Sequence, residues 1–140
     1  MSEFLQRFAR RFSEVDAEHL ELLAELYSDD VQFRDPLHCV EGLPALRDYF
    51  AQLYANVQDL QFEFHAYDQV GEGLGYLRWT LRFRHPRLKN AELIEVRGCS
   101  CLMWDSKVRL HHDYFDAGAL LYEHLPLLGG AIGWLKRRLA

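Results

Sequence analysis

The first half of the chain has the apolar spacing of helices, with one short strand. Apolar residues recur at intervals of three and four, and they predict three helices, over residues 2–15, 16–27 and 44–57. Ser2 and Asp16 can cap the first two helices, and Pro44 suits the first turn of the third. Residues 31–34 predict a short strand, which stops at Asp35 because a proline follows.

From Leu60 onward the pattern changes to that of strands. Alternating, β-branched and aromatic runs predict four strands, over residues 60–70, 74–84, 91–104 and 107–116. Most of the connections are short turns, which favour antiparallel pairing. A last helix is predicted over about residues 120–139, and Pro126 and the pair Gly129-Gly130 predict a kink or a break in it.

This order of elements predicts a single α+β domain over residues 1–140. The four long strands form a strongly curved antiparallel sheet, and the N-terminal helices pack across its concave face. Such a sheet is cone-shaped, and the interior of a cone is a natural pocket for a small molecule.

The composition excludes several classes of partner. The chain has a formal net charge of −5, and a mildly acidic domain argues against binding to nucleic acid. No apolar stretch is long enough to span a bilayer, so no stable membrane insertion is expected. The N-terminus lacks a basic segment followed by an apolar run, which predicts a cytoplasmic protein.

The three cysteines add no sign of a metal site. Cys39, Cys99 and Cys101 cannot all pair within one chain, and none has C-x-x-C spacing. We therefore expect reduced thiols, no bound zinc or other metal, and no cofactor.

The end of the last predicted helix leaves two interpretations open. Lys136, Arg137 and Arg138 follow an apolar segment. Basic residues complement the C-terminal end of a helix dipole, which fits a helix that closes the cone. The same pattern fits an amphipathic element at a membrane surface.

The last predicted strand carries the most informative side chains. Because side chains alternate along a strand, Arg109, His111, Asp113 and Phe115 share one face. An imidazole and a carboxylate two residues apart on one face can form an acid–base pair. The alternative is that the pair is structural, as is common on curved sheets.

Three segments resemble those of a known superfamily: residues 26–36, the pair Glu41-Gly42 before a helix, and residues 107–116. They are similar to the nuclear transport factor 2-like superfamily, and most of all to its SnoaL-like and ketosteroid-isomerase-like members. The resemblance covers the whole chain and implies the cone fold. It does not fix the function, because this fold is used by isomerases, cyclases, epoxide hydrolases, dehydratases and non-enzymatic binders.

The resemblance also implies roles for individual residues. Asp35 matches the aspartate base of ketosteroid isomerases, whereas Phe8 and Ser100 stand where those enzymes have oxyanion-hole donors. His111 and Asp113 match the histidine and aspartate of SnoaL-like cyclases. Epoxide hydrolases use Arg-x-Asp on a middle strand, and this chain keeps the arginine as Arg78 but has threonine in place of the aspartate.

Together these observations predict a domain that binds a small apolar molecule. As an enzyme it is an isomerase, cyclase or hydrolase that transfers protons; the alternative is a non-catalytic ligand-binding or protein-interaction domain. The predicted catalytic residues are Asp35, His111 and Asp113, and the predicted binding residues are Phe8, Tyr49, Phe50, Arg78, Ser100 and Phe115.

Large side chains on both faces of the middle strands predict a homodimer through the exposed face of the sheet. The sequence leaves open whether Arg78 or its neighbour Trp79 faces the pocket.

Overall fold

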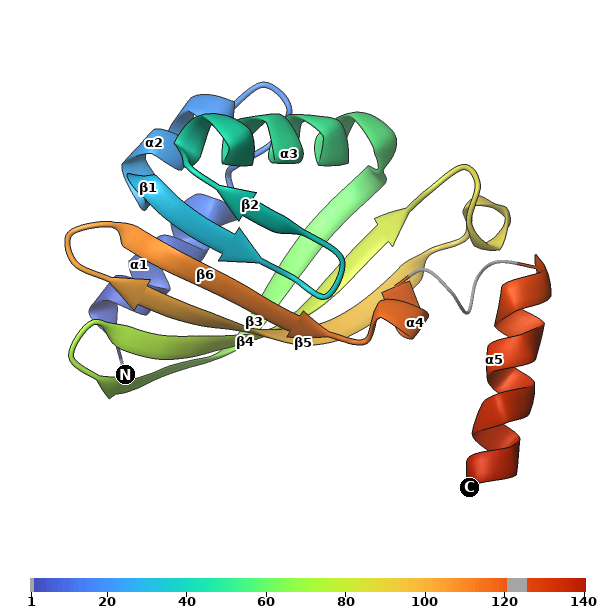
Figure 1. Ribbon diagram of the computed structural model, residues 1–140. Helices are drawn as coiled ribbons and strands as arrows, with labels where there is room; N and C mark the ends of the chain where they lie inside the picture. The colour runs from blue at the N-terminus through green and yellow to red at the C-terminus, as the bar shows by residue number, and fades with distance from the viewer. Residues whose placement is uncertain (1, 121–125) are drawn as a thin grey trace.

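The computed structural model describes residues 2–120 and 126–140, and it confirms the predicted α+β fold (Figure 1). Six strands form one curved, unclosed sheet in the order β2-β1-β6-β5-β4-β3. The strands are β1 (Tyr27–Arg34), β2 (Cys39–Glu41), β3 (Gln58–Gly71), β4 (Leu74–Arg84), β5 (Ile94–Trp104) and β6 (Val108–Phe115).

The pairing of the strands combines local and long-range contacts. Strands β3 to β6 pair antiparallel in chain order, as the short turns predict. Strand β1 pairs antiparallel with β2 and parallel with β6, so that Phe33 lies opposite His111. The parallel pairing joins the N-terminal part of the chain to the last strand.

The helices lie mainly on one side of the sheet (Figure 1). They are α1 (Glu3–Phe12), the 3-10 turn η1 (Leu20–Leu22), α2 (Leu23–Leu26), α3 (Leu43–Asn56), the 3-10 turn η2 (Lys89–Ala91), α4 (Ala117–Leu120) and α5 (Pro126–Leu139). Ser2 caps α1 as predicted, because its side chain accepts a hydrogen bond from the Leu5 amide at 3.2 Å. Leu5 and Phe8 of α1, and Leu46 and Phe50 of α3, are buried.

The burial of β4 shows which face of the sheet is concave. Leu77, Trp79, Leu81 and Phe83 are buried, whereas Tyr76 and Arg78 are exposed on the other face. Trp79 lies opposite Gly98 of β5, and a Cβ atom at Gly98 would collide with the indole ring. The glycine therefore allows the largest core side chain to lie flat across the neighbouring strand.

Three elements differ from the prediction. The second helix is shorter, since Tyr27 already belongs to β1 and pairs with Val108 of β6. The short strand β2 was not predicted, because three residues are too few for an alternating pattern. Helix α5 starts at Pro126, one of the two places where a kink or a break is predicted, and it continues without a break through Gly129-Gly130, the other.

The start of the predicted last helix lies partly outside the described residues. The chain forms the short helix α4 up to Leu120, and residues 121–125 follow before α5. Among the helices that the structure describes, none combines the length and the apolar character needed to cross a membrane.

Candidate functional site

A chain of hydrogen bonds links four side chains to Asp113 on the concave side of β5 and β6. Trp79 donates from Nε1 to Oγ of Ser100 at 2.8 Å, and Ser100 donates to Oδ1 of Asp113. Nε2 of His111 lies 2.7 Å from the same Oδ1 atom, and Nδ1 of His111 lies 2.8 Å from the hydroxyl of Tyr27. Strand alternation puts His111 and Asp113 on one face, as predicted.

The direction of each hydrogen bond follows from what each group can donate. An indole can only donate, so Ser100 accepts from Trp79 and gives its own proton to Asp113. The fully buried Tyr27 hydroxyl needs an acceptor, and Nδ1 of His111 is the one in reach. With Tyr27 as the donor at Nδ1, the ring proton of His111 is on Nε2, which donates to Asp113.

This arrangement leaves one carboxylate atom open. Both ring nitrogens of His111 are occupied, and Oδ1 of Asp113 accepts two hydrogen bonds. Among the described residues, none donates to Oδ2 of Asp113. The Asp113 side chain is 14% exposed, against 4% for His111, so Oδ2 is the free acceptor of the cluster.

Aromatic rings surround the imidazole of His111. Phe33 is the nearest, with 4.8 Å between ring centroids, and Tyr27 follows at 5.8 Å and Phe8 and Phe12 at 6.2 and 6.3 Å. Burial, together with the charge of Asp113, raises the pKa of Tyr27 well above its usual range. Tyr27 therefore stays protonated and holds the tautomer of His111 fixed.

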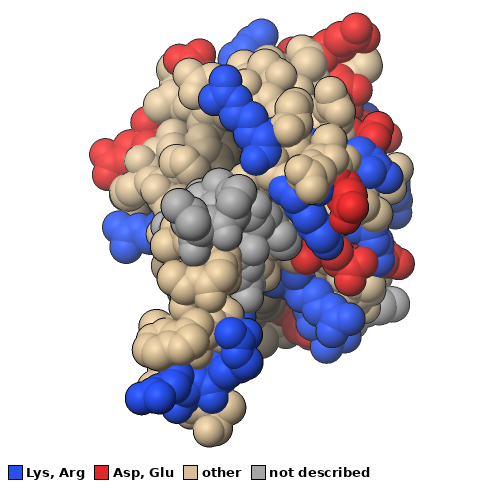
Figure 2. Space-filling view, turned by 90° about the vertical axis from the view of Figure 1, so that its right-hand side faces the viewer, with Lys and Arg blue, Asp and Glu red and all other residues tan. Residues whose placement is uncertain are grey.

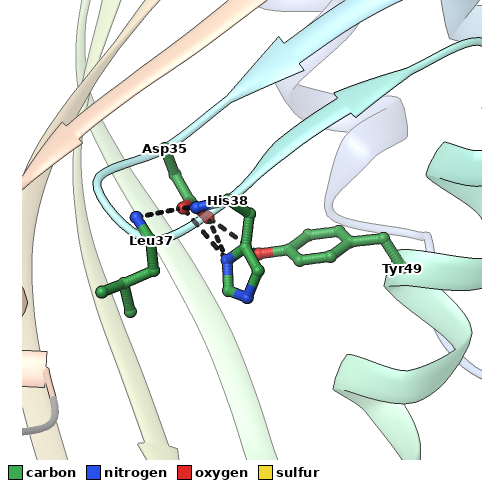
Figure 3. Close-up of polar contacts among 4 residues, drawn as sticks. All are labelled: Asp35, Leu37, His38 and Tyr49. Carbon is green, nitrogen blue, oxygen red and sulfur yellow. Dashed lines mark hydrogen bonds and ion pairs between the residues drawn. The ribbon is translucent and has the colours of Figure 1, made fainter.

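Asp35 lies in a second cluster, at the turn between β1 and β2 (Figure 3). Its Oδ1 atom accepts hydrogen bonds from the amides of Leu37 and His38 at 2.8 and 2.7 Å. Its Oδ2 atom accepts from the hydroxyl of Tyr49 on α3 at 2.8 Å, and Nδ1 of His38 lies 3.1 Å from Oδ1. These are the contacts of a turn aspartate before proline, which is the common structural role of this residue.

The two clusters are neighbours but are not joined by a hydrogen bond among the described residues. Phe33 separates them, with ring centroids 5.3 Å from Tyr49 and 4.8 Å from His111. Burial raises the pKa of Tyr49, and the negative charges of Asp35 and Asp113 raise it further. Both carboxylates therefore act on one hydroxyl in the interior of the cone.

An apolar cavity of about 360 Å³ lies further along α3. Leu53 and Val57 on the helix side and Leu81 and Phe83 on the β4 side contribute to its lining. Leu53 follows Tyr49 by one helical turn on the same face, about 6 Å along the axis. The cavity lining thus includes the residue that lies one helical turn beyond Tyr49 on α3.

The structure places the predicted binding residues in different surroundings. Phe8 and Phe50 are buried in the core, and Ser100 is part of the hydrogen-bond chain. Tyr49 is half-buried against Asp35, and Phe115 packs against Trp79 with centroids 6.3 Å apart.

The prediction that Arg78 is a binding residue of the pocket is wrong. It is exposed on the convex face, because its neighbour Trp79 occupies the concave face and successive side chains of a strand point to opposite sides. Arg78 therefore does not line the interior.

Sequence reasoning missed the part that Tyr27 and Trp79 play in the cluster. Tyr27 is 84 positions from His111 along the chain, and the apolar spacing places it at the end of a helix. For Trp79 the sequence leaves open whether it faces the pocket or an outer patch. The one available signal is Gly98, which lies opposite Trp79 and leaves room for a large side chain.

The matching family model agrees with this architecture. The model of the SnoaL-like domain matches residues 5–109. The chain belongs to the SnoaL-like domain family. His111 and Asp113 lie just beyond the matched residues of this SnoaL-like domain, so their role depends on the geometry of β6. No curated protein sequence matches the chain.

Solved structures with the same fold are distant in sequence. TsrD from Streptomyces laurentii is 17% identical, with a TM-score of 0.73, over 90% of this chain and 98% of its own. A protein from Catenulispora acidiphila with a ketosteroid isomerase-like fold, solved with trimethylamine, is 12% identical, with a TM-score of 0.74, over 90% and 95%. An LEH-like epoxide hydrolase from M. tuberculosis is 15% identical, with a TM-score of 0.67, over 85% and 86%. At this identity the likeness establishes the fold of the SnoaL-like domain and not its reaction.

No group of three or more metal-binding side chains lies together among residues 2–120 and 126–140.

Proposed function

We propose that this SnoaL-like domain binds a small, largely apolar molecule inside the cone and that Oδ2 of Asp113 accepts a proton from it. The observation that carries the proposal is the direction of the hydrogen bonds around Asp113. Ser100 and His111 both donate to Oδ1, which fixes the carboxylate and directs the unoccupied Oδ2 atom to a ligand.

The apolar cavity along α3 supplies the place for the body of the ligand. Leu53, Val57, Leu81 and Phe83 offer a mainly apolar lining, to which His85 and Arg87 add polar groups. Under this proposal, a molecule seated there must reach past Tyr49 and Phe33 to Asp113. A polarised C–H group at its inner end would meet the carboxylate.

The proton transfer balances without a further reactant. The carboxylate takes a proton from a carbon next to a carbonyl group, becomes a carboxylic acid and leaves an enolate. Return of the proton to another carbon gives an isomerase. Attack of the enolate carbon on a second carbonyl group gives a cyclase, and the alkoxide that forms takes the proton back from the carboxylic acid. Both outcomes fit the apolar cavity.

Deuterium exchange tests this proposal directly. In D₂O we expect the protein to speed the exchange of the acidic C–H groups of 2-tetralone, an apolar aromatic ketone, followed by proton NMR. Asp113→Asn should abolish the acceleration, whereas Asp105→Asn, at an exposed turn before β6, should retain it. Equal rates with and without the wild-type protein would reject proton transfer to this ketone class.

A non-catalytic binding domain is the second candidate, and the packing around His111 favours it. Phe8, Phe12 and Phe33 already contact the imidazole and fill much of the space beside it. Fluorescence of Trp79 in the Trp104→Phe/Trp134→Phe variant reports binding near Ser100. A fluorescence change without deuterium exchange would identify a binder that does not turn its ligand over.

We also propose that the chain forms a homodimer through the convex face of the sheet. Tyr76 and Arg78 of β4 and Tyr114 of β6 are exposed there, next to the ion pairs of Arg82 with Glu63 and Glu95. An interface of this kind buries on the order of 1,200 Å² or more in total. Sedimentation velocity at micromolar concentration should show a dimer that Tyr114→Lys weakens, and a monomer alone would contradict it.

The thiols support a cytoplasmic location, which we propose as the compartment of this protein. Cys39 is exposed, and Cys99 and Cys101 are half-buried without forming a disulfide. Burial raises the pKa of the Cys99 thiol, so this residue should react more slowly than Cys39. All three should react after unfolding without a reductant, and fewer than three would indicate a disulfide.

A further inference from the structure

Helix α5 stands apart from the sheet and from the other helices (Figure 1). Its exposed apolar side chains are Leu128, Trp134, Leu135 and Leu139, with exposed fractions of 43 to 79%. An isolated helix of fourteen residues is marginal in water, and a row of exposed large apolar side chains marks a contact surface.

The helix is amphipathic. Leu128, Ile132, Leu135 and Leu139 follow the spacing of one helix face. Gly133 and Arg137 lie on the opposite side, and a guanidinium nitrogen of Arg137 would lie 3.5 Å from a Cβ atom at Gly133. Lys136 and Arg138 flank the leucine stripe on its two sides, and Trp134 lies away from the stripe, beside Arg138.

The charge of α5 is opposite to that of the chain. Lys136, Arg137 and Arg138 lie in its last turn, and residues 126–139 contain no aspartate or glutamate, whereas the chain as a whole carries −5. The guanidinium of Arg138 lies 5.4 Å from the centre of the Trp134 ring. In Figure 2 the projecting end of the molecule shows blue basic side chains among tan ones.

We propose that α5 binds an anionic lipid surface and lies in its interface. Basic side chains attract negative headgroups, and the leucine stripe enters the boundary between headgroups and acyl chains, with Trp134 beside the basic residues at the headgroup level. Fourteen residues span about 21 Å, which is too short for the roughly 30 Å hydrocarbon core of a bilayer. The helix therefore lies on the membrane and does not cross it.

The charges disfavour the α5 helix of a second copy as the partner. Two α5 helices would bring like charges together, since neither carries an acidic residue. The apolar cavity along α3 is not complementary either, because His85 and Arg87 contribute to its lining. An anionic lipid surface complements both the apolar stripe and the basic end.

Vesicle sedimentation of the full chain tests the proposal. We expect binding to vesicles of phosphatidylcholine with 30% phosphatidylglycerol, and at least about tenfold weaker binding to phosphatidylcholine alone. Arg137→Glu/Arg138→Glu should lower binding by about tenfold or more. The control, Arg10→Glu/Arg47→Glu, makes the same change in net charge at exposed positions of α1 and α3 and should leave binding within about twofold.

The apolar stripe is tested separately. Leu135→Ser should weaken vesicle binding and prevent the blue shift of Trp134 fluorescence, whereas Val70→Ser, at an exposed position of β3, should change neither. If Arg10→Glu/Arg47→Glu lost as much vesicle binding as Arg137→Glu/Arg138→Glu, net charge alone would explain the binding and the proposal would be rejected. A change from dimer to monomer in the α5 variants, with no vesicle binding by the wild type, would show that α5 contacts a second copy instead.

Discussion

Asp113 and Asp35 are two carboxylates inside the same cone, and their surroundings differ in one respect that decides what each can do. Both oxygens of Asp35 accept hydrogen bonds, from two backbone amides and from Tyr49. Asp113 receives its two hydrogen bonds on Oδ1 alone, from Ser100 and His111. A carboxylate with both oxygens occupied stabilises a turn, whereas one with a free oxygen can meet a ligand.

The comparison shows that burial does not by itself identify a base. The Asp35 side chain is more buried than that of Asp113, at 4% against 14% exposed. Its hydrogen bonds, however, hold the β1–β2 turn against α3. The number and direction of donors around each carboxylate separate the two roles better than depth in the fold does.

The largest expected effect is on proton transfer at Asp113. Asp113→Asn should lower the rate of deuterium exchange by about 10²- to 10⁴-fold, the usual contribution of a general base. Asp35→Asn should change it by less than about tenfold, because its oxygens face the turn. NMR exchange rates for both variants check this, and a larger loss in Asp35→Asn would reverse the assignment.

For the free energy of unfolding, we expect the opposite order: substitution of Asp35 should cost more than substitution of Asp113. Asp35→Ala leaves the amides of Leu37 and His38 and the hydroxyl of Tyr49 without their acceptor, which should cost about 2–4 kcal/mol of unfolding free energy. Asp113→Asn keeps an acceptor for Ser100 and His111 and should cost less than about 1 kcal/mol. Urea unfolding measures both, and equal losses would remove the distinction.

Gly98→Ala should disturb the Asp113 cluster alone. The added Cβ atom collides with the Trp79 ring, so Trp79 must shift away from Ser100, at a cost of about 1–3 kcal/mol. Gly71→Ala is the matched control, because its Cβ atom would lie 3.8 Å from Leu74 in ordinary contact. If the indole of Gly98→Ala keeps its hydrogen bond, as seen by the Nε1 proton in NMR, the packing argument is wrong.

The smallest effect concerns an exposed pair, Asp16 and His19, whose side chains are 2.6 Å apart. Its hydrogen bond lowers the pKa of Asp16 and raises that of His19. The raised pKa of His19 stabilises the fold below about pH 6.5, and this stabilisation is lost as the pH rises. The lowered pKa of Asp16 stabilises the fold above about pH 4, and this stabilisation is lost as the pH falls.

Asp16→Asn should therefore lower the urea midpoint most between about pH 4 and 6.5. The difference should be small, because water screens an exposed pair. If Asp16→Asn lowered the urea midpoint as much as Asp35→Ala does, the difference in exposure between Asp16 and Asp35 would not explain their contributions to stability. Midpoints measured at pH 5 and pH 8 for both variants make the test.

The sequence by itself determined the elements whose signals are local. Ser2 caps α1, the alternation of β6 puts His111 and Asp113 on one face, and the turns set the antiparallel order of β3 to β6. These features depend on neighbouring residues along the chain, so periodicity and turn chemistry suffice to predict them.

Only the tertiary structure decided which face of β4 turns inward. Both faces of this strand carry large side chains, Arg78 on one and Trp79 on the other, and the inward face is the one on which Gly98 leaves room for the indole ring. The parallel pairing of β1 with β6 brings Tyr27 to His111 across 84 positions and fixes its tautomer. The occupancy of the Asp35 oxygens likewise depends on Tyr49 of α3. Such contacts between distant segments leave no periodic signal in the sequence, since they depend on the packing of whole elements.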